Sequence, residues 1–286
     1  DAAPVVGPAW SDKRFEALGV EGVDAVICDS TNALQAGRSV TEGRVAQGLT
    51  EAIQRSEGRV VVGCFSSNIA RIQTLSQIAA DTGRYLGVLG RSAAGMANCA
   101  QQVGLFPSQF KPIHAEHLGY LPPREVLAIA TGSQGESGAA LHRLVAQTHP
   151  HLSLEAGDTV ILSSRTIPGN EASVARLIEG FRARGIHVLE ADSSDTPLHA
   201  SGHPYQDELR DLYQLLKPSL VVPVHGEAAH MAANARIAKQ AGASAALTGV
   251  NGDLFYLSPV PGVRRRYAPV GRLQWCEDTE RLINVN

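Results

Sequence analysis

Residues 196–227 read TPLHASGHPYQDELRDLYQLLKPSLVVPVHGE and form the most informative stretch of the chain. The apolar run at residues 220–224 predicts a buried strand, and His225 and Gly226 follow it directly. His199 and His203 lie upstream in a Gly- and Ser-containing loop that precedes a helix-like segment. Because histidine is a common metal ligand and proton shuttle near neutral pH, the three histidines together indicate a metal or catalytic site. The alternative is that they are solvated or capping side chains in loops.

Short apolar runs alternate with amphipathic helical patterns through most of the chain. The predicted strands lie at residues 23–28, 60–65, 85–89, 126–130, 159–162 and 187–190. The predicted helices lie at residues 41–55, 69–80, 93–103 and 172–184. Continuous apolar strands that alternate with helices predict an α/β fold whose mostly parallel sheet is covered on both faces. Asn251-Gly252, between apolar runs at 245–247 and 254–257, additionally predicts an antiparallel hairpin.

Four of the predicted strands end in polar or glycine-rich turns that precede a helix. These turns are Asp29-Ser30-Thr31-Asn32, Ser66-Ser67-Asn68, Thr131-Gly132-Ser133-Gln134-Gly135-Glu136 and Ile167-Pro168-Gly169-Asn170-Glu171. The free N–H groups at a helix start favour anions, phosphate above all, and ligands of parallel sheets gather at the carboxyl edge. Ordinary N-capping explains any one turn. Together, the turns predict an anionic ligand without identifying it.

Composition limits the choices further. The 286 residues suffice for one large α/β domain or two ordinary ones. A net charge of −3 gives no overall sign of nucleic-acid binding, which would need a local basic patch. The four scattered cysteines contain no C-x-x-C pair, so we expect a reducing, cytoplasmic environment. Since no run of about 18 apolar residues occurs, we expect no membrane span.

Six motifs occur in the order seen in ribonuclease J, the family of bacterial β-CASP nucleases in the metallo-β-lactamase superfamily. They are the turns at 29–32, 66–68, 131–136 and 167–171, His199-Ala200-Ser201-Gly202-His203, and Pro223-Val224-His225-Gly226-Glu227. The resemblance covers nearly the whole chain. It implies a β-CASP parallel-sheet domain at residues 36–185, inserted in a partial metallo-β-lactamase (αββα-type) domain at residues 1–35 and 186–262. Residues 263–286 would begin a linker toward a C-terminal domain.

The resemblance also implies an activity and the residues that carry it. It predicts a metal-dependent ribonuclease of RNA processing and decay, acting as a 5′-exonuclease, an endonuclease or both. His225 would bind a metal. His203 would donate a proton to the leaving oxygen, with its tautomer fixed by Asp29. The alternative interpretation is that Asp29 has only a structural role and caps the turn after its strand.

Further residues are implied as substrate contacts. His199, Ala200, Ser201, Gly202 and His203 would contact the scissile phosphate of single-stranded RNA, and Ser66, Ser67 and Asn68 the phosphate of a neighbouring nucleotide. The implied cofactor is a pair of zinc ions, with manganese or magnesium as alternatives. Glu171 and Glu227 fit capping or supporting roles better than catalysis.

The chain departs from the family at its principal metal motif. The pattern H-x-H-x-D-H is absent, as is the family's G-D-F-K segment, which by resemblance lies upstream of Asp1. The family's C-terminal domain, which supports dimerisation, is also absent. We therefore expect an incomplete portion of a longer homo-oligomeric enzyme, inactive and poorly loaded with metal unless the missing N-terminal segment is supplied.

Two alternatives stay open. A small-molecule hydrolase of the metallo-β-lactamase type would share the core but would not need the long insertion between Asp29 and His187. A non-catalytic RNA- or phosphate-binding module fits the absent metal motif. The upstream coding sequence separates the three readings, because H-x-H-x-D-H followed by G-D-F-K supports the nuclease.

Overall fold

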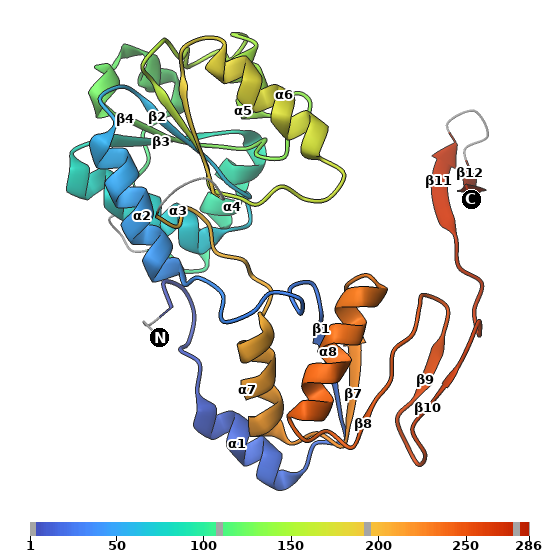
Figure 1. Cartoon of the computed structure of the whole chain (residues 1–286). Coiled ribbons are helices and arrows are strands. Elements are labelled where there is room, and N and C mark those ends of the chain that lie inside the picture. The colour runs from blue at the N-terminus through green and yellow to red at the C-terminus, as the bar shows by residue number, and fades with distance from the viewer. Residues whose placement is uncertain (1–3, 107–110, 192–195, 277–280, 286) are drawn as a thin grey trace. The chain divides into compact units, whose positions relative to one another are not determined.

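The computed structural model describes residues 4–106, 111–191, 196–276 and 281–285 (Figure 1). The chain divides into two compact units. Unit 1 contains Val40–Ser201 and residues 4–9, and unit 2 contains Trp10–Ser39 and the described residues from Gly202 onward. In the described residues, no helix has the length and apolar character needed to cross a membrane.

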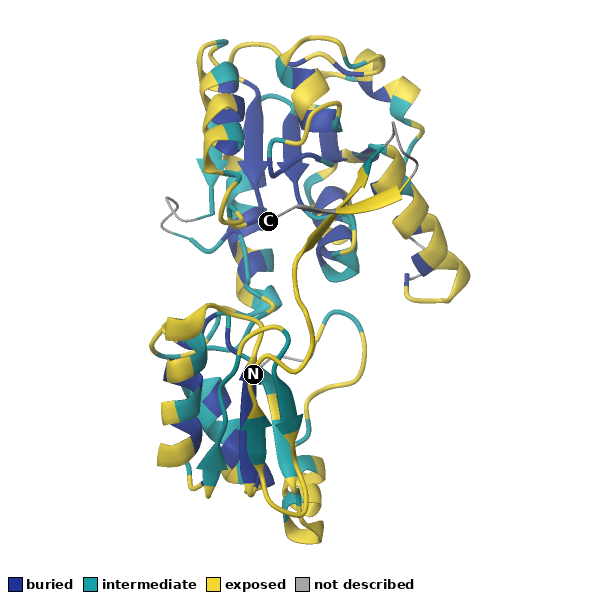
Figure 2. Ribbon diagram, turned by 90° about the vertical axis from the view of Figure 1, so that its right-hand side faces the viewer, coloured by how far each residue is buried: buried dark blue, intermediate teal, exposed yellow. Residues whose placement is uncertain are grey.

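Unit 1 is built on a five-stranded, wholly parallel sheet with the strand order β3-β4-β2-β5-β6. The strands are β2 (Val60–Gly63), β3 (Tyr85–Leu89), β4 (Val126–Ala130), β5 (Thr159–Leu162) and β6 (His187–Glu190). The central strands β2, β4 and β5 are buried along their whole length (Figure 2). Their continuous apolar runs arise because both faces of a parallel sheet are covered by helices. The predicted α/β architecture is confirmed.

Helices cover both faces of this sheet. They are α2 (Glu42–Arg55), α3 (Ile69–Thr82), α4 (Arg91–Gln102), α5 (Ala140–Val145) and α6 (Glu171–Arg182), with short 3₁₀ turns at Ala115–Tyr120 and Pro123–Glu125. Val60 and Val62 of β2 pack into a core with apolar residues of α2, α3 and α4. Val61, which points to the opposite face, packs with apolar residues of α5 and α6.

Unit 2 contains a three-stranded parallel sheet in the order β1-β7-β8. Its strands are β1 (Ala25–Asp29), β7 (Leu220–Val224) and β8 (Ala245–Ala246), and its helices are α1 (Asp12–Glu21), α7 (Gln206–Leu216) and α8 (Ala228–Gln240). Ala25 pairs with Leu220, and Asp29 pairs with Val224. Two segments far apart in the sequence thus share one sheet. As a result, the turns after β1 and β7 lie side by side.

The predicted hairpin around Asn251-Gly252 is wrong. β8 pairs with β7 in parallel, and β9 (Leu254–Tyr256) pairs instead with β10 (Gly262–Arg264). The carboxylate of Asp253 accepts the backbone N–H groups of Val250 and Arg266, at 3.0 and 2.9 Å, so the turn closes on a later segment. A second antiparallel pair joins β11 (Arg272–Cys276) and β12 (Arg281–Val285). Antiparallel structure is therefore present late in the chain, with other partners.

The boundary between the units differs from the predicted domain boundary at residue 185. β6 pairs in parallel with β5, so residues 187–190 complete the sheet of unit 1. Unit 1 then continues to Ser201, because Leu198 is fully buried in its core. The H-A-S-G-H motif therefore begins in unit 1 and ends in unit 2.

Candidate functional site

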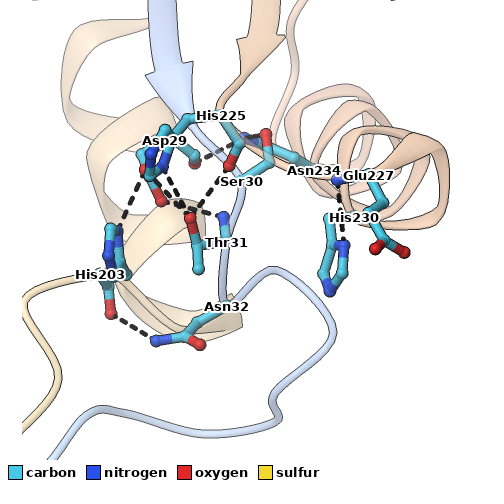
Figure 3. Close-up of polar contacts among 9 residues, drawn as sticks. All are labelled: Asp29, Ser30, Thr31, Asn32, His203, His225, Glu227, His230 and Asn234. Carbon is cyan, nitrogen blue, oxygen red and sulfur yellow. Dashed lines mark hydrogen bonds and ion pairs between the residues drawn. The ribbon is translucent and has the colours of Figure 1, made fainter. Parts of the chain in front are cut away.

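Asp29, His203 and His225 gather in unit 2, with one potential metal-binding atom from each lying within 4.8 Å of the others (Figure 3). Asp29 is the last residue of β1, and His225 directly follows the neighbouring strand β7. Parallel pairing of these strands places both residues at the carboxyl edge of the sheet. His203 lies in the loop before α7. The predicted convergence holds for these three residues.

One carboxylate oxygen of Asp29 serves both imidazole rings. Its Oδ2 lies 2.6 Å from Nδ1 of His225 and 3.1 Å from Nδ1 of His203. Its Oδ1 accepts the backbone N–H of Thr31 at 2.9 Å. Since a carboxylate accepts hydrogen bonds, the contacts assign a hydrogen to each Nδ1 and leave each Nε2 as the outer nitrogen.

Both histidines remain accessible. Their rings stack with centroids 5.3 Å apart and planes inclined by 23°. The side chain of His225 is 67% exposed and that of Asp29 is 26% exposed. A ligand can therefore reach the rings without displacing core residues.

The backbone at His225 has an uncommon conformation. Its φ of 55° lies in the left-handed region, which costs a non-glycine residue about 1–3 kcal/mol. The hydroxyl of Thr31 donates to the carbonyl of His225 at 3.0 Å and lies 2.9 Å from its Nδ1. A Cβ at Gly226 would stand 2.9 Å from Cβ of His230, so the next position requires glycine. The turn is held in a single arrangement that directs His225 toward Asp29.

A buried hydrogen-bond network supports the turn from behind. Nδ2 of Asn234 donates to the carbonyl of Asp29 and to Oγ of Ser30, both at 3.0 Å. The hydroxyl of Tyr213 donates to Oδ1 of Asn234 at 2.5 Å, and both side chains are fully buried. Sequence reasoning missed these two residues. The sequence offered one indication of the network, because Asn234 is a polar residue on the apolar face of the helix that follows His225-Gly226-Glu227.

A second supporting contact was also missed. Nδ2 of Asn32 donates to the carbonyl of His203 at 3.1 Å, which ties the loop before α7 to the turn after β1. Glu227 is the N-cap residue of α8, and its backbone N–H donates to Nδ1 of His230 at 3.3 Å, which agrees with a capping or supporting role.

Ser66, Ser67 and Asn68 lie in unit 1 between β2 and α3. Oδ1 of Asn68 accepts the backbone N–H of Arg71 at 3.0 Å and caps α3. The NH₂ group of the side chain carries two N–H donors, which this bond does not use. Capping and a phosphate contact by Asn68 are therefore compatible, and the phosphate contact stays a prediction.

Two of the other predicted anion turns are closed by their own side chains. Oε1 of Gln134 accepts the backbone N–H of Ile167 at 2.8 Å, so the buried glutamine joins the turns after β4 and β5. The carboxylate of Glu136 accepts the N–H of Gln134 at 2.9 Å, and that of Glu171 accepts the N–H of Gly169 at 2.8 Å. These donors are engaged within unit 1, which favours a structural role for both turns.

His199, Ala200 and Ser201 belong to unit 1, whereas Gly202 and His203 belong to unit 2. Burial, and next to it the nearby Arg71 guanidinium, lowers the pKa of His199. The convergence of residues 199–201 and 66–68 with the Asp29 cluster stays a prediction.

The Asp29 cluster fits a divalent metal of the zinc class. Imidazole nitrogen and carboxylate oxygen are zinc ligands, and a ligating histidine commonly gives its other N–H to a carboxylate. His225 meets this pattern, since its Nδ1 faces Asp29 and its Nε2 is the outer nitrogen. One such ligand does not complete a zinc site, which normally takes three or four protein ligands.

Two family descriptions match the chain. "Ribonuclease J, beta-CASP domain" matches residues 57–181, and "Zn-dependent metallo-hydrolase RNA specificity domain" matches residues 196–247. The second match contains His199, His203 and His225, which are the three histidines of the opening stretch.

Several curated proteins share the sequence over most of its length. Ribonuclease J of Sinorhizobium meliloti is 41% identical over 96% of this chain and 48% of its own length. Ribonuclease J of Mycolicibacterium smegmatis is 38% identical over 85% of this chain and 43% of its own. Ribonuclease J2 of Bacillus subtilis is 33% identical over the same two shares. The chain thus spans about half the length of these relatives, and it belongs to the ribonuclease J family.

Proposed function

We propose that the complete protein is a metal-dependent ribonuclease that hydrolyses phosphodiester bonds of single-stranded RNA in RNA processing and decay. The observation that carries the proposal is the pair of histidines that share Oδ2 of Asp29 at 2.6 and 3.1 Å. A carboxylate that orients two accessible imidazoles equips one edge of a sheet for both metal binding and proton transfer. The names of the relatives support RNA as the substrate.

His225 is the residue of this chain that we assign to the metal. Zinc is the expected ion, two per complete enzyme, with manganese or magnesium as alternatives. When bound, such ions polarise the phosphodiester and make a water nucleophilic near neutral pH. Asp29 holds the His225 ring by its Nδ1, so the ring keeps its Nε2 free for the ion.

His203 is the proposed general acid, with Asp29 as its orienting partner. The carboxylate fixes the hydrogen on Nδ1 of His203, so that proton transfer to the leaving oxygen takes place at Nε2. The bond from Asn32 to the His203 carbonyl fixes the backbone from which the ring extends.

We assign phosphate binding to residues 66–68 and 199–201 of unit 1 and to Gly202, which follows the second segment. Ser66, Ser67 and Asn68 stand at the start of α3, where backbone N–H groups favour a phosphate. His199, Ala200, Ser201 and Gly202 would contact the scissile phosphate together with His203. Such contacts fix the register of the RNA without reading its bases.

The partners that we propose follow from the span of the chain. The chain matches about half of each relative, so the rest of the metal site is assigned to an N-terminal segment and homo-oligomer formation to a C-terminal domain. By itself the chain would be poorly loaded with metal and inactive.

The test is RNA cleavage by the complete protein. We expect it to degrade 5′-monophosphorylated single-stranded RNA, to lose this activity to a chelator, and to regain it with added zinc or manganese. A circular RNA of the same sequence separates the modes, since only an endonuclease cleaves it. Hydrolysis of a small thioester without RNA cleavage would overturn the proposal in favour of a small-molecule hydrolase. RNA binding without cleavage would favour a non-catalytic module.

A further inference from the structure

Arg71, in the first turn of α3, is a fully buried charge in unit 1. Its Nη2 donates to Oε1 of Glu42 at 2.9 Å, and its Nε donates to Oε2 of the same carboxylate at 3.1 Å. Its Nη1 donates to the carbonyls of Ser163 at 3.2 Å and Leu198 at 3.3 Å, and also contacts Oγ of Ser163. One guanidinium therefore joins the start of α2, the end of β5 and the segment 196–201.

The carbonyl of Leu198 is bound twice. It accepts from Nη1 of Arg71 and, at 2.6 Å, from Oγ of Ser163. The side chain of Leu198 is also fully buried in the core that α2 and α3 cover. Hydrogen bonds from charged donors are stronger than those between neutral groups. The backbone immediately before His199 is thus fixed by a charge and a hydroxyl rather than by packing alone.

Close backbone packing at the preceding residue makes a second, independent anchor. A Cβ at Gly48 of α2 would stand 2.2 Å from the carbonyl oxygen of Pro197. Real Cβ atoms do not approach an oxygen this closely, so α2 needs glycine where the segment crosses it. By contrast, a Cβ at Gly95 of α4 would meet nothing within 4 Å.

The ring of His199 has a hydrogen bond with the backbone of Ser163, but only one of its two nitrogens is satisfied. Its Nδ1 is buried without a hydrogen-bond partner among the described residues. An unsatisfied buried nitrogen favours turning the ring toward water. The anchored backbone at residues 197–198 opposes that motion.

We propose that Arg71 is a positioning residue, which with Ser163 and Gly48 holds His199, Ala200 and Ser201 in place for the phosphate of the substrate. The assignment rests on the proposed function, because it presumes that this segment binds RNA. Glu42 neutralises the guanidinium and fixes its orientation from the solvent side. The chemistry of the reaction does not pass through Arg71, which acts through the backbone of Leu198.

Arg84 provides a matched control for Arg71. It too is buried in unit 1, and it donates to four backbone carbonyls, those of Ile53, Ser56, Gly58 and Val126. These carbonyls lie at the carboxyl end of α2 and at or just before the starts of β2 and β4, whereas Ser163 follows the carboxyl end of β5. Arg71→Lys and Arg84→Lys each remove a buried guanidinium that donates to backbone carbonyls, at opposite ends of the strands of one sheet.

The test combines hydrogen–deuterium exchange with RNA cleavage in the complete protein, below the melting temperature of every variant. In Arg71→Lys, amides of residues 196–201 should exchange about tenfold faster, since lost bonds to a charged donor shift local opening by about that factor. The kcat/KM for single-stranded RNA should fall about 10²-fold, as a misplaced contact group can cost that much. Arg84→Lys should accelerate exchange only at residues 53–58 and 126, with kcat/KM unchanged.

Two further variants, of which Ser163→Ala is the milder, keep the test valid if Arg71→Lys does not fold. Gly48→Ala should accelerate exchange at 196–201 and lower kcat/KM, while Gly95→Ala should do neither. Ser163→Ala should act in the same direction as Gly48→Ala. Unchanged exchange at 196–201 in Gly48→Ala and Ser163→Ala, or equal activity losses in the Arg71 and Arg84 variants, would overturn the positioning role. Wild-type protein without RNase activity would overturn the proposed function, whereas the exchange result would still decide whether Arg71 anchors the segment.

Discussion

The clusters around Arg71 and Asp29 both place a charge at the carboxyl end of a parallel sheet, but they satisfy it differently. Arg71 is fully buried, and each of its three guanidinium nitrogens has an acceptor in Glu42, Ser163 or Leu198. Asp29 is partly exposed, and one of its oxygens is approached by two imidazole rings. A saturated buried charge holds elements together. A shared, accessible carboxylate leaves its partners able to exchange contacts when a ligand arrives.

This difference separates a structural role from a reactive role near the carboxyl ends of two parallel sheets. The Arg71 cluster leaves no polar atom of its guanidinium for a ligand, so changing it should first alter stability and placement. The Asp29 cluster presents the exposed imidazole of His225 beside that of His203, so changing it should first alter chemistry. The distinction would be contradicted if replacing Asp29 mainly lowered stability, or if replacing a residue of the Arg71 cluster abolished the chemical step without changing stability or placement.

The largest expected effect is the loss of activity on replacing Asp29. In the complete protein, Asp29→Asn keeps the size of the side chain but removes the charge that orients both rings. We expect kcat to fall about 10²–10⁴-fold, the range of a general acid–base group. The melting temperature should change little because Asp29 is partly exposed. Steady-state cleavage of single-stranded RNA measures this.

Asp24→Asn is the matched control for the charge change. Asp24 is exposed and directly precedes β1, so its replacement alters the net charge equally at the other end of the strand. It should leave kcat unchanged. Wild-type activity in Asp29→Asn, or equal losses in both variants, would contradict a reactive role for Asp29.

A smaller effect, on stability, is expected at Glu42. Removing one partner of a fully buried ion pair costs about 3–5 kcal/mol. Because the side chain of Glu42 is 28% exposed and Gln still accepts a hydrogen bond, we expect Glu42→Gln to cost about 2 kcal/mol. Urea unfolding followed by circular dichroism measures the loss.

Glu51→Gln on the same helix is its control. Glu51 pairs with Arg55 at 3.5 Å, and both side chains are exposed. Exposed pairs of this spacing contribute about 0.3–0.5 kcal/mol, so the control should lose no more than that. A similar loss in the two variants would show that the Arg71–Glu42 pair does not stabilise unit 1.

The smallest effect is expected at Asn68, where capping and phosphate binding can be separated. Asn68→Ala removes the cap of α3 and should cost about 1 kcal/mol. Asn68→Asp keeps a capping oxygen, so its unfolding free energy should stay near that of the wild type. Both variants should weaken RNA binding, and the carboxylate of the aspartate should repel the phosphate. If RNA binding weakens only in Asn68→Ala, the variant that also loses stability, then Asn68 is a helix cap and not a phosphate contact.

The sheet of unit 1 could be predicted because its strands are short, apolar and bounded by polar turns. Residues 85–89, 126–130, 159–162 and 187–190 are strands as predicted. The error at Asn251-Gly252 arose because a turn pattern does not say which strand follows it in the sheet. Asp253 binds a later segment through the backbone N–H of Arg266, and a local pattern does not contain that information.

The sequence was sufficient to predict the side chains of the candidate site that can bind a metal or transfer a proton. Asp29, His203 and His225 follow strands or precede a helix, and these positions are visible in the sequence. Asn234 and Tyr213 were missed because their role depends on packing between α7 and α8. Arg71 carried a signal that was not used: it recurs with Leu75 and Ile78 at spacings that place a charge on the buried face of α3.

The most direct test of the central claim compares metal content and single-turnover cleavage in His203→Ala and His225→Ala forms of the complete protein. The substrate is a 5′-monophosphorylated single-stranded RNA. We predict that His203→Ala keeps the wild-type metal content and loses cleavage at every metal concentration. His225→Ala should bind less metal and recover part of its activity when metal is added. Equal metal loss in the two variants would contradict the division of roles, and full activity in both would contradict the ribonuclease site itself.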